Sequence, residues 1–201
     1  MTASSGDAGA GIRADAHISP TRLRHALGRF ASGVTVVTTS TGDHGDPDAH
    51  GMTANSFTSV SLHPPLVLVS VATEAVTHQR IAESGRYGIS ILSGDQKPLS
   101  EHFAGGAQRP ELVRFVWRQE LPMLAGALVH LMCTVRQAHL AGDHTVYIGE
   151  VDGLWSGPGS PLVNYRKQFH TLDVLCQDGS PGPARRGGLL SNGKTGRSTH
   201  G

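Results

Sequence analysis

Short runs of β-branched and other apolar residues recur along most of this chain, and clusters of turn-forming residues separate them. The runs with the length and residue types of strands cover residues 34–40, 66–72, 87–92, 128–140 and 145–155. They do not alternate regularly with helices of about 10–15 residues, as strands do in a parallel sheet of the dinucleotide-binding type. The pattern therefore predicts a mainly β fold, built as an antiparallel barrel.

Three short helices are expected beside this barrel. The first begins with Ser19 as N-cap and Pro20 in its first turn, and its apolar residues recur with helical spacing until Gly33: Leu23, Ala26, Leu27 and Phe30. The other two span about 75–84 and about 95–104, and each ends before a glycine. We expect these helices to cap or flank the barrel.

The chain has one predicted domain, residues 19–175, which is large enough to bury a hydrophobic core. Residues 1–18 and 176–201 are rich in Gly, Ser, Pro and Ala and contain few large apolar residues. Such segments cannot offset the entropy lost on ordering, so both are expected to be disordered tails.

Charge and cysteine content exclude several classes of protein. Lys and Arg total 17 against 16 Asp and Glu, with no long block of one sign, so no nucleic-acid partner is expected. Only Cys133 and Cys176 are present, which excludes a disulfide-rich scaffold and favours a reducing cytoplasm. Cys133 lies in an apolar strand and is expected to be an inert core thiol. No apolar stretch is long enough to span a membrane, so no membrane association is expected.

Several catalytic and metal-binding motifs are missing from the sequence. It contains no GxGxxG, HExxH or GxSxG motif, so the corresponding dinucleotide, metalloprotease and hydrolase sites are not expected. The 12 histidines do not have the paired spacing of metal ligands, so no metal site is expected.

Residues 50–65 concentrate short polar side chains, namely those of Thr53, Asn55, Ser56, Thr58, Ser59 and Ser61. One interpretation is a polar edge strand and loop such as any barrel has. The other is a ligand-binding loop, because hydroxyls, an amide and free backbone N–H groups can hold a phosphate and reach the polar edge of a heterocycle.

Two later segments are also open to two interpretations. Within 141–151, His144 follows a tight turn and lies either at the exposed end of a hairpin or at a strand mouth that faces a pocket. In the pocket, its imidazole could stack on a nicotinamide or form a hydrogen bond with it. Within 161–172, Arg166 lies among aromatic residues on a terminal strand, either on a solvated face or paired with a phosphate or a flavin edge.

Together these segments resemble the flavin reductase-like family, the FMN-binding split-barrel proteins that serve as reductase partners of flavin-dependent monooxygenases. The resemblance extends from about Leu23 to Leu172. It is carried by the order and spacing of GVTVVTT (33–39), HGMTANSFTSVSLHPPLVLVSV (50–71), THQRIAESGRYGISIL (77–92), LSEHFAG (99–105), GALVHLMCTV (126–135), GDHTVYIGEV (142–151) and PLVNYRKQFHTL (161–172).

The resemblance implies a Greek-key split barrel that forms a homodimer, with flavin near the subunit interface. It implies hydride transfer from NADH or NADPH to FMN or FAD, and diffusion of reduced flavin to a partner monooxygenase. The flavin-binding positions that it implies are Thr53, Ala54, Asn55, Ser56, Ser61, Thr77 and Arg166. On the nicotinamide side, the implied catalytic position is His144.

Residues 72–77 depart from the pattern of the resembled family. The usual basic or serine-rich phosphate anchor is partly missing there, and Glu74 would repel a phosphate. This departure keeps two alternatives open. One is a flavin- or haem-binding split-barrel protein without reductase turnover, and the other is a flavin-dependent oxidase that modifies an organic substrate.

Overall fold

The computed structural model describes residues 17–42 and 49–172 of the chain. The predicted tail at 176–201, which includes Cys176, lies outside the described residues, as do all but the last two residues of the predicted tail at 1–18. Within the described residues, no helix is both long and apolar enough to cross a membrane.

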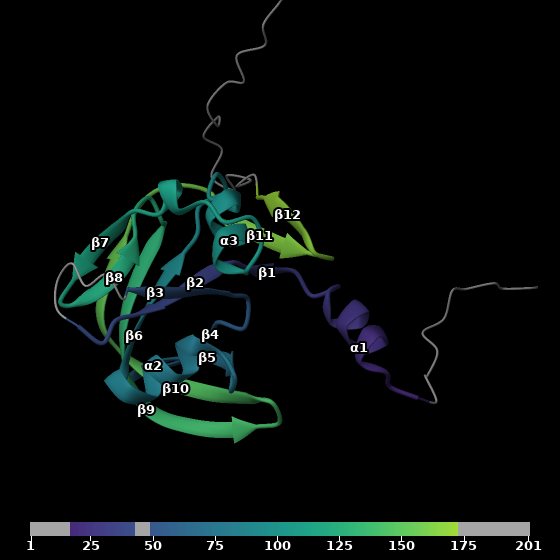
Figure 1. Ribbon diagram of the computed structural model, residues 1–201, viewed down its shortest axis with the longest axis horizontal. Helices are drawn as coiled ribbons and strands as arrows, with labels where there is room; N and C mark the ends of the chain where they lie inside the picture. The colour runs from purple at the N-terminus through teal and green to yellow at the C-terminus, as the bar shows by residue number, and fades with distance from the viewer. Residues whose placement is uncertain (1–16, 43–48, 173–201) are drawn as a thin grey trace, which may run out of the picture.

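Seven strands form the main sheet, in the order β3-β2-β6-β9-β10-β5-β4 (Figure 1). Their bounds are β2 Thr35–Thr39, β3 His50–Ala54, β4 Thr58–Leu62, β5 Pro65–Ala72, β6 Arg86–Ile91, β9 Val129–Ala141 and β10 His144–Ser156. Two small sheets contain β1 Ser32–Gly33, β11 Leu162–Tyr165 and β12 Gln168–Thr171, and β7 Phe115–Arg118 and β8 Leu121–Leu124. All pairs of named strands are antiparallel, which confirms the predicted mainly β, antiparallel architecture.

The helices are α1 Pro20–Leu27, α2 Val76–Ser84 and α3 Lys97–Phe103, with a 3-10 turn at Pro110–Leu112. As predicted, the Ser19 side chain caps α1 by accepting a hydrogen bond from the backbone N–H of Arg22, at 3.3 Å. The expectation that this helix continues to Gly33 is wrong. It ends at Leu27 because Gly28 is its C-cap, and Gly33 already pairs with β11. Two residues predicted on one helix, Leu27 and Phe30, therefore lie on either side of its end.

The core forms where the strands turn their apolar residues inward. Along β5, Val67, Val69 and Val71 are buried and the residues between them are less so, as expected for a strand with one face on the core. They pack in one cluster with Tyr87 of β6 and Leu131 of β9. Burial of each large apolar side chain contributes about 1.5–3 kcal/mol to the free energy of folding, so this cluster stabilises the strands that carry the loops at the end of the barrel.

The barrel is closed by a crossing segment, residues 55–57, between strands that are adjacent in sequence. β3 and β4 follow one another along the chain yet occupy opposite edges of the seven-stranded sheet. The Ser56 hydroxyl donates to the Ser70 carbonyl and accepts from the Ser70 N–H, each at 3.0 Å, which fastens the segment to β5. Residue 55 therefore lies where the two edges of the sheet approach one another.

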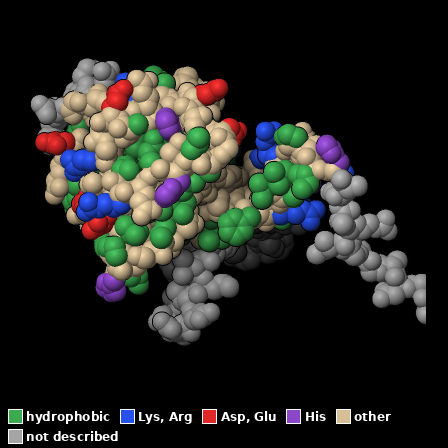
Figure 2. Space-filling model, turned by 90° about the horizontal axis from the view of Figure 1, so that it is seen from below, with side chains coloured by type: hydrophobic (Ala, Val, Ile, Leu, Met, Phe, Trp, Pro, Cys, Tyr) green, Lys and Arg blue, Asp and Glu red, His purple; other side chains and the backbone are tan. Residues whose placement is uncertain are grey.

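α1 stands apart from the barrel (Figures 1 and 2). None of its residues is buried, and the exposed fractions of Leu27 and Phe30 are 64% and 81%. The segment after the helix is held to the barrel by a hydrogen bond of 2.8 Å from the Arg166 N–H to the Gly28 carbonyl.

Two hairpins differ from the sequence expectation. Residues 161–172 were expected to form one terminal strand, but they form β11 and β12, joined by a two-residue turn at Arg166 and Lys167. β7 and β8 were not predicted, and their turn consists of Gln119 and Glu120. All four turn residues have positive φ, from 42° to 72°. Glycine and asparagine usually signal such turns, so these sequences gave no signal.

Candidate functional site

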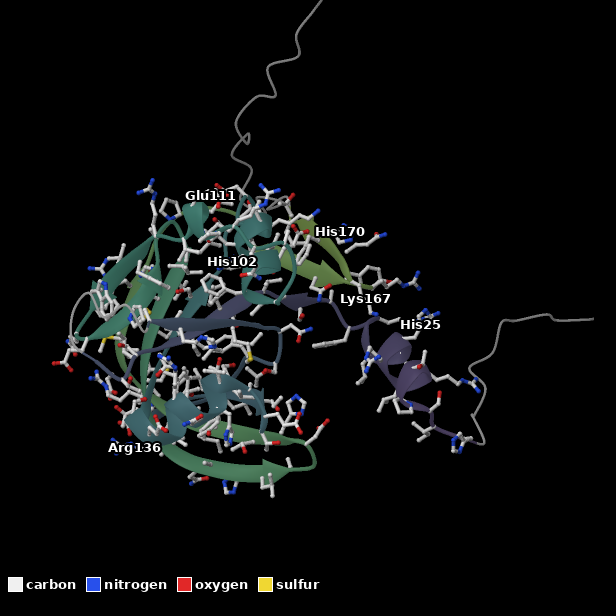
Figure 3. The ribbon with its side chains drawn as sticks, in the orientation of Figure 1. His25, His102, Glu111, Arg136, Lys167 and His170 are labelled. Carbon is white, nitrogen blue, oxygen red and sulfur yellow. The ribbon has the colours of Figure 1, made fainter. Side chains whose placement is uncertain are left out.

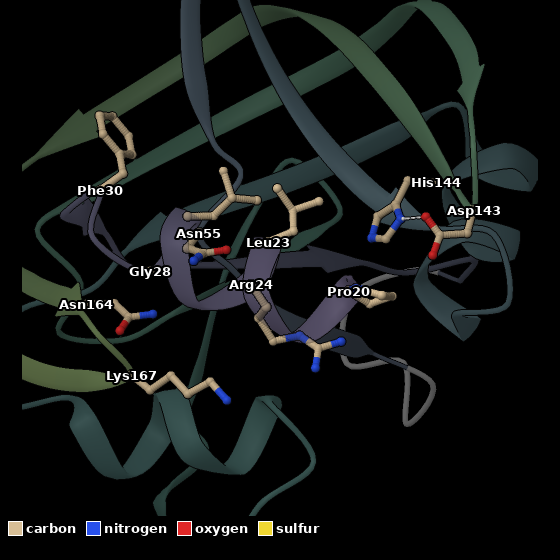
Figure 4. A pocket seen from close by; sticks show the side chains of 11 residues that line it. Pro20, Leu23, Arg24, Gly28, Phe30, Asn55, Asp143, His144, Asn164 and Lys167 are labelled. Atoms are coloured by element: carbon tan, nitrogen blue, oxygen red, sulfur yellow. Dashed lines mark hydrogen bonds and ion pairs between the residues drawn. The ribbon is translucent and has the colours of Figure 1, made fainter. Parts of the chain in front are cut away.

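A cavity of about 590 Å³ lies between α1 and the end of the barrel (Figure 4). We call it the α1 cavity. Residues 20–30 supply one wall, and the barrel supplies Asn55, Asp143, His144, Asn164 and Lys167. Its volume is in the range that holds a small molecule or cofactor.

His144 is brought to this cavity by the β9–β10 hairpin. It is the first residue of β10 and pairs with Ala141 on one side and Ala72 on the other. Its Nδ1 lies 2.7 Å from Oδ1 of Asp143, and this hydrogen bond lowers the pKa of the Asp143 carboxyl. Since Nδ1 is engaged, Nε2 is the ring nitrogen left to meet a ligand.

Asn55 reaches the same cavity from the crossing segment, whereas its neighbours have structural partners. Thr53 donates to the Ser100 carbonyl at 2.7 Å, Ala54 is buried, and Ser56 is bonded to Ser70. Of these four positions, Asn55 is the one whose side chain lines the α1 cavity. Ser61 lies farther along the chain, in β4, where its hydroxyl donates to the Pro64 carbonyl within the β4–β5 hairpin.

Thr77 lines a second cavity, of about 410 Å³, at the N-terminus of α2. We call it the α2 cavity. The Thr77 side chain is 1% exposed, and its hydroxyl has no hydrogen-bond partner within the described part of the chain. Ala75 is the N-cap and provides no side-chain cap for the first turn. An orphaned hydroxyl beside an uncapped helix N-terminus suits a phosphate oxygen.

β3 links the two cavities. His50, at its start, lines the α2 cavity, and Asn55, just after its end, lines the α1 cavity. Five steps along a strand span about 16 Å. A flavin mononucleotide is an elongated molecule with a ring at one end and a phosphate at the other, so the two cavities fit the two ends of one flavin.

Arg166 is not in the α1 cavity but beside it. Its guanidinium carbon lies 5.3 Å from the centre of the Tyr165 ring, in a cation-π arrangement. With Arg24 and Lys167 it lines an adjoining hollow of about 280 Å³. Arg166 is therefore placed where it could contact a ligand that extends out of the α1 cavity.

Sequence reasoning did not identify the wall supplied by α1, nor Lys167. The helix was expected from its periodicity, but periodicity gives no position for a helix relative to a barrel. Lys167 was noted only as one of the cations interleaved with aromatic residues in 161–172. The signal that could have indicated a binding role for Lys167 was the pair of adjacent cations, Arg166 and Lys167, at the end of a strand.

Other reactive groups lie away from both cavities. Cys133 is fully buried on β9, as expected for a core thiol, and burial raises its pKa to about 12. No group of three His, Cys, Asp or Glu side chains within residues 17–42 and 49–172 could hold a metal ion.

Comparison with known proteins agrees with this arrangement. The family model described as "Flavin reductase like domain" matches residues 27–173. An NADH-dependent flavin reductase from a Rhodococcus species is 58% identical over 164 residues, covering 82% of this chain and 93% of that protein. The reductase subunit HsaB of a flavin-dependent monooxygenase from Mycobacterium tuberculosis is 37% identical over 165 residues, covering 79% and 85%.

A solved structure shows the same fold. The Streptomyces globisporus NADH:FAD oxidoreductase SgcE6, in complex with NAD and FAD fragments, superposes with a TM-score of 0.71 at 36% identity, covering 78% of this chain and 94% of that one. The split-barrel fold expected from the sequence is thereby confirmed. The family match covers most of the chain, and we conclude that this protein is a member of the flavin reductase like domain family.

Proposed function

We propose that this protein is a flavin reductase that uses NADH to reduce FMN or FAD. The observation that carries the proposal is that Asn55 and His144, which come from distant parts of the sequence, line one cavity of about 590 Å³. The named relatives, which are NADH-dependent flavin or FAD reductases, support the same reaction.

The residues of the two cavities would act by holding the reactants rather than by acid or base chemistry. When bound, the flavin would accept at its N5 atom the hydride that leaves C4 of the dihydronicotinamide. Asn55 would orient the polar edge of the flavin ring, and Thr77 with the first turn of α2 would hold the phosphate. His144 would hold the nicotinamide through Nε2. Fixing both rings in contact removes translational and rotational entropy from the barrier.

A direct test follows the absorbance of NADH and NADPH at 340 nm with FMN and with FAD, using the purified protein. We expect rapid oxidation of NADH that depends on added flavin. Flavin binding without nucleotide oxidation would contradict the reductase and favour the alternative, a flavin-binding protein without turnover. Consumption of oxygen with an organic substrate in the absence of NADH would favour the flavin-dependent oxidase.

Replacing Thr77 with valine tests the phosphate site. Valine has nearly the same shape, and the hydroxyl has no partner to lose, so we expect little change in thermal stability. The affinity for FMN should fall about 10-fold to 100-fold, because one hydrogen bond to a charged phosphate is lost. Riboflavin, which lacks the phosphate, should bind equally to both proteins in a fluorescence titration. An unchanged affinity for FMN would remove Thr77 from the site.

We also propose that the reduced flavin leaves by diffusion and serves a separate monooxygenase. The relative HsaB is the reductase subunit of such an enzyme. The α1 cavity opens to solvent beside the exposed residues of α1, which suits a flavin that enters and leaves as a substrate. If the protein and a flavin-dependent monooxygenase are placed on opposite sides of a dialysis membrane that flavin can cross, the monooxygenase should then still hydroxylate its substrate.

A homodimer is the proposed assembly. Leu23, Leu27 and Phe30 are exposed on and just after α1, and Figure 2 shows apolar side chains gathered on this lobe. Because all three residues line the α1 cavity, a second copy that covers them would border this cavity, consistent with a flavin site near the subunit interface.

The double variant Leu27→Glu with Phe30→Glu should be largely monomeric. Each lost apolar side chain is worth about 1.5–3 kcal/mol, so the dimer dissociation constant should rise at least about 100-fold. Light scattering after gel filtration, over a dilution series, measures this change, and circular dichroism checks that the barrel is intact. A wild-type protein that is monomeric at micromolar concentration would contradict the proposal.

A further inference from the structure

The turn between β11 and β12 places a lysine where the backbone favours glycine. Arg166 and Lys167 are the two central residues of the turn and have φ of 52° and 62°. Such hairpin turns usually have Asn-Gly at these positions, because side chains other than glycine are strained at positive φ. Within the described residues, the Lys167 ammonium has no hydrogen bond or ion pair.

A second hairpin turn in the same molecule gives a comparison. Gln119 and Glu120 join β7 to β8 with φ of 42° and 72°. There the Glu120 carboxylate lies 3.5 Å from Arg86, so its side chain has a partner within the protein. Lys167 has the same backbone strain without such a partner. Strained residues cluster at ligand sites, and this contrast indicates that the partner of Lys167 is a ligand.

Lys167 lies at the junction of the barrel and α1 (Figure 3). It lines the α1 cavity together with Arg24 (Figure 4). Both residues also line the adjoining hollow with Arg166. The acidic residue that lines the α1 cavity is Asp143, which is already bonded to His144, and the adjoining hollow is lined by no acidic residue of the described chain. Three cations therefore face a joined recess in which the one carboxylate is engaged, so the recess suits an anion.

We propose that Lys167 and Arg24 bind the pyrophosphate of the nicotinamide dinucleotide, while its nicotinamide end lies beside His144. This inference rests on the proposed function and names the subsite that holds the hydride donor. A lysine ammonium acts on a phosphate as a compact charge, and a guanidinium can contact two phosphate oxygens at once. The flavin phosphate has a separate subsite at Thr77, in a cavity that shares no lining residue with this one.

The decisive variant is Lys167→Gly, which removes the charge and relieves the strain together. We expect the KM for NADH to rise roughly tenfold, while kcat at saturating NADH and the dissociation constants for FMN and FAD stay unchanged. The melting temperature should stay the same or rise. The matched control is Glu120→Gly, which makes the same change in the other turn and should leave the KM for NADH unaltered.

The hydride donor offers a second control. Dihydronicotinamide riboside has no phosphate, so kcat/KM with this donor should be equal in the wild-type protein and in Lys167→Gly. If the wild-type protein reduces flavin and Lys167→Gly keeps the wild-type KM for NADH, the subsite is wrong although the reductase is right. If the affinity for FAD falls and that for FMN does not, the recess holds the flavin dinucleotide and the inference is overturned. A wild-type protein that reduces no flavin with either donor contradicts the proposed function itself.

Discussion

Replacing His144 with alanine should lower kcat/KM for NADH between about 10-fold and 100-fold, equivalent to about 1.4–2.8 kcal/mol of transition-state stabilisation. The imidazole is held by Asp143 through Nδ1 at 2.7 Å, so Nε2 is presented to the cavity in a fixed orientation. Removing it takes away both a hydrogen bond and a ring surface that position the nicotinamide. Stopped-flow measurement of flavin bleaching at several NADH concentrations checks this result.

The control for this variant comes from the same hairpin. His139 lies on β9, is exposed, and contacts Gln137 at 3.0 Å, away from both cavities. His139→Ala should therefore leave the reductase kinetics unchanged. Flavin affinity should be unchanged in both variants, since Asn55 and Thr77 are untouched. Wild-type kinetics for His144→Ala would exclude this histidine from nicotinamide binding.

Replacing Gly149 with alanine should destabilise the protein by about 3 kcal/mol, because a new methyl group would have no room. A Cβ at this position of β10 would lie 2.8 Å from Cζ of Tyr87 and closer still to its hydroxyl oxygen, and 3.0 Å from Cβ of Cys133. Tyr87 and Cys133 are fully buried, so neither can move into solvent. The melting temperature should fall by about 6–12 °C, and calorimetry measures the change.

Two further variants separate this packing effect from other effects of glycine. The Tyr87 hydroxyl is buried beside the Cys133 thiol and has no other hydrogen-bond partner in the described structure, so Tyr87→Phe removes the nearest clashing atom and loses only a weak contact with a thiol. The double variant with Gly149→Ala should regain part of the lost stability, a coupling that independent sites would not show. Gly33→Ala, with nothing within 4 Å of the new Cβ, should be nearly neutral. Additive losses in the double variant would contradict the clash.

Much of the barrel was predictable from the residue pattern of its strands. Their apolar residues either alternate with polar ones or form continuous runs, and the turns between them contain glycine or proline. β5, α2 with its end at Gly85, and the β9–β10 hairpin all follow from such local signals. The β7–β8 and β11–β12 hairpins could not be found this way, since their turns place Gln, Glu, Arg and Lys at positive φ. Local propensity describes the backbone conformation that a residue type prefers, and in these turns the pairing of the flanking strands imposes a different conformation.

The site was predictable in its residue types but not in its grouping. The sequence predicted that residues 53–56 form one binding segment. In the described structure their side chains have different partners, and of these four residues only Asn55 lines the α1 cavity. A strand alternates the direction of its side chains, but the partners of Thr53 and Ser56 depend on α3 and β5, which are distant in sequence. The contribution of Lys167 was hidden for the same reason.

The wall that residues 20–30 supply to the α1 cavity contains no buried residue within its helix, whereas the opposite wall belongs to the barrel. Apart from the exposed apolar residues that we propose to contact a second copy, substitutions on that wall are therefore nearly free of the packing constraints that govern the core. Evolution, or an engineer, can reshape one half of the cavity while the frame that carries His144 and Asn55 stays the same. Chains with the same barrel can in this way come to prefer different electron donors or acceptors by exchanging a single N-terminal segment.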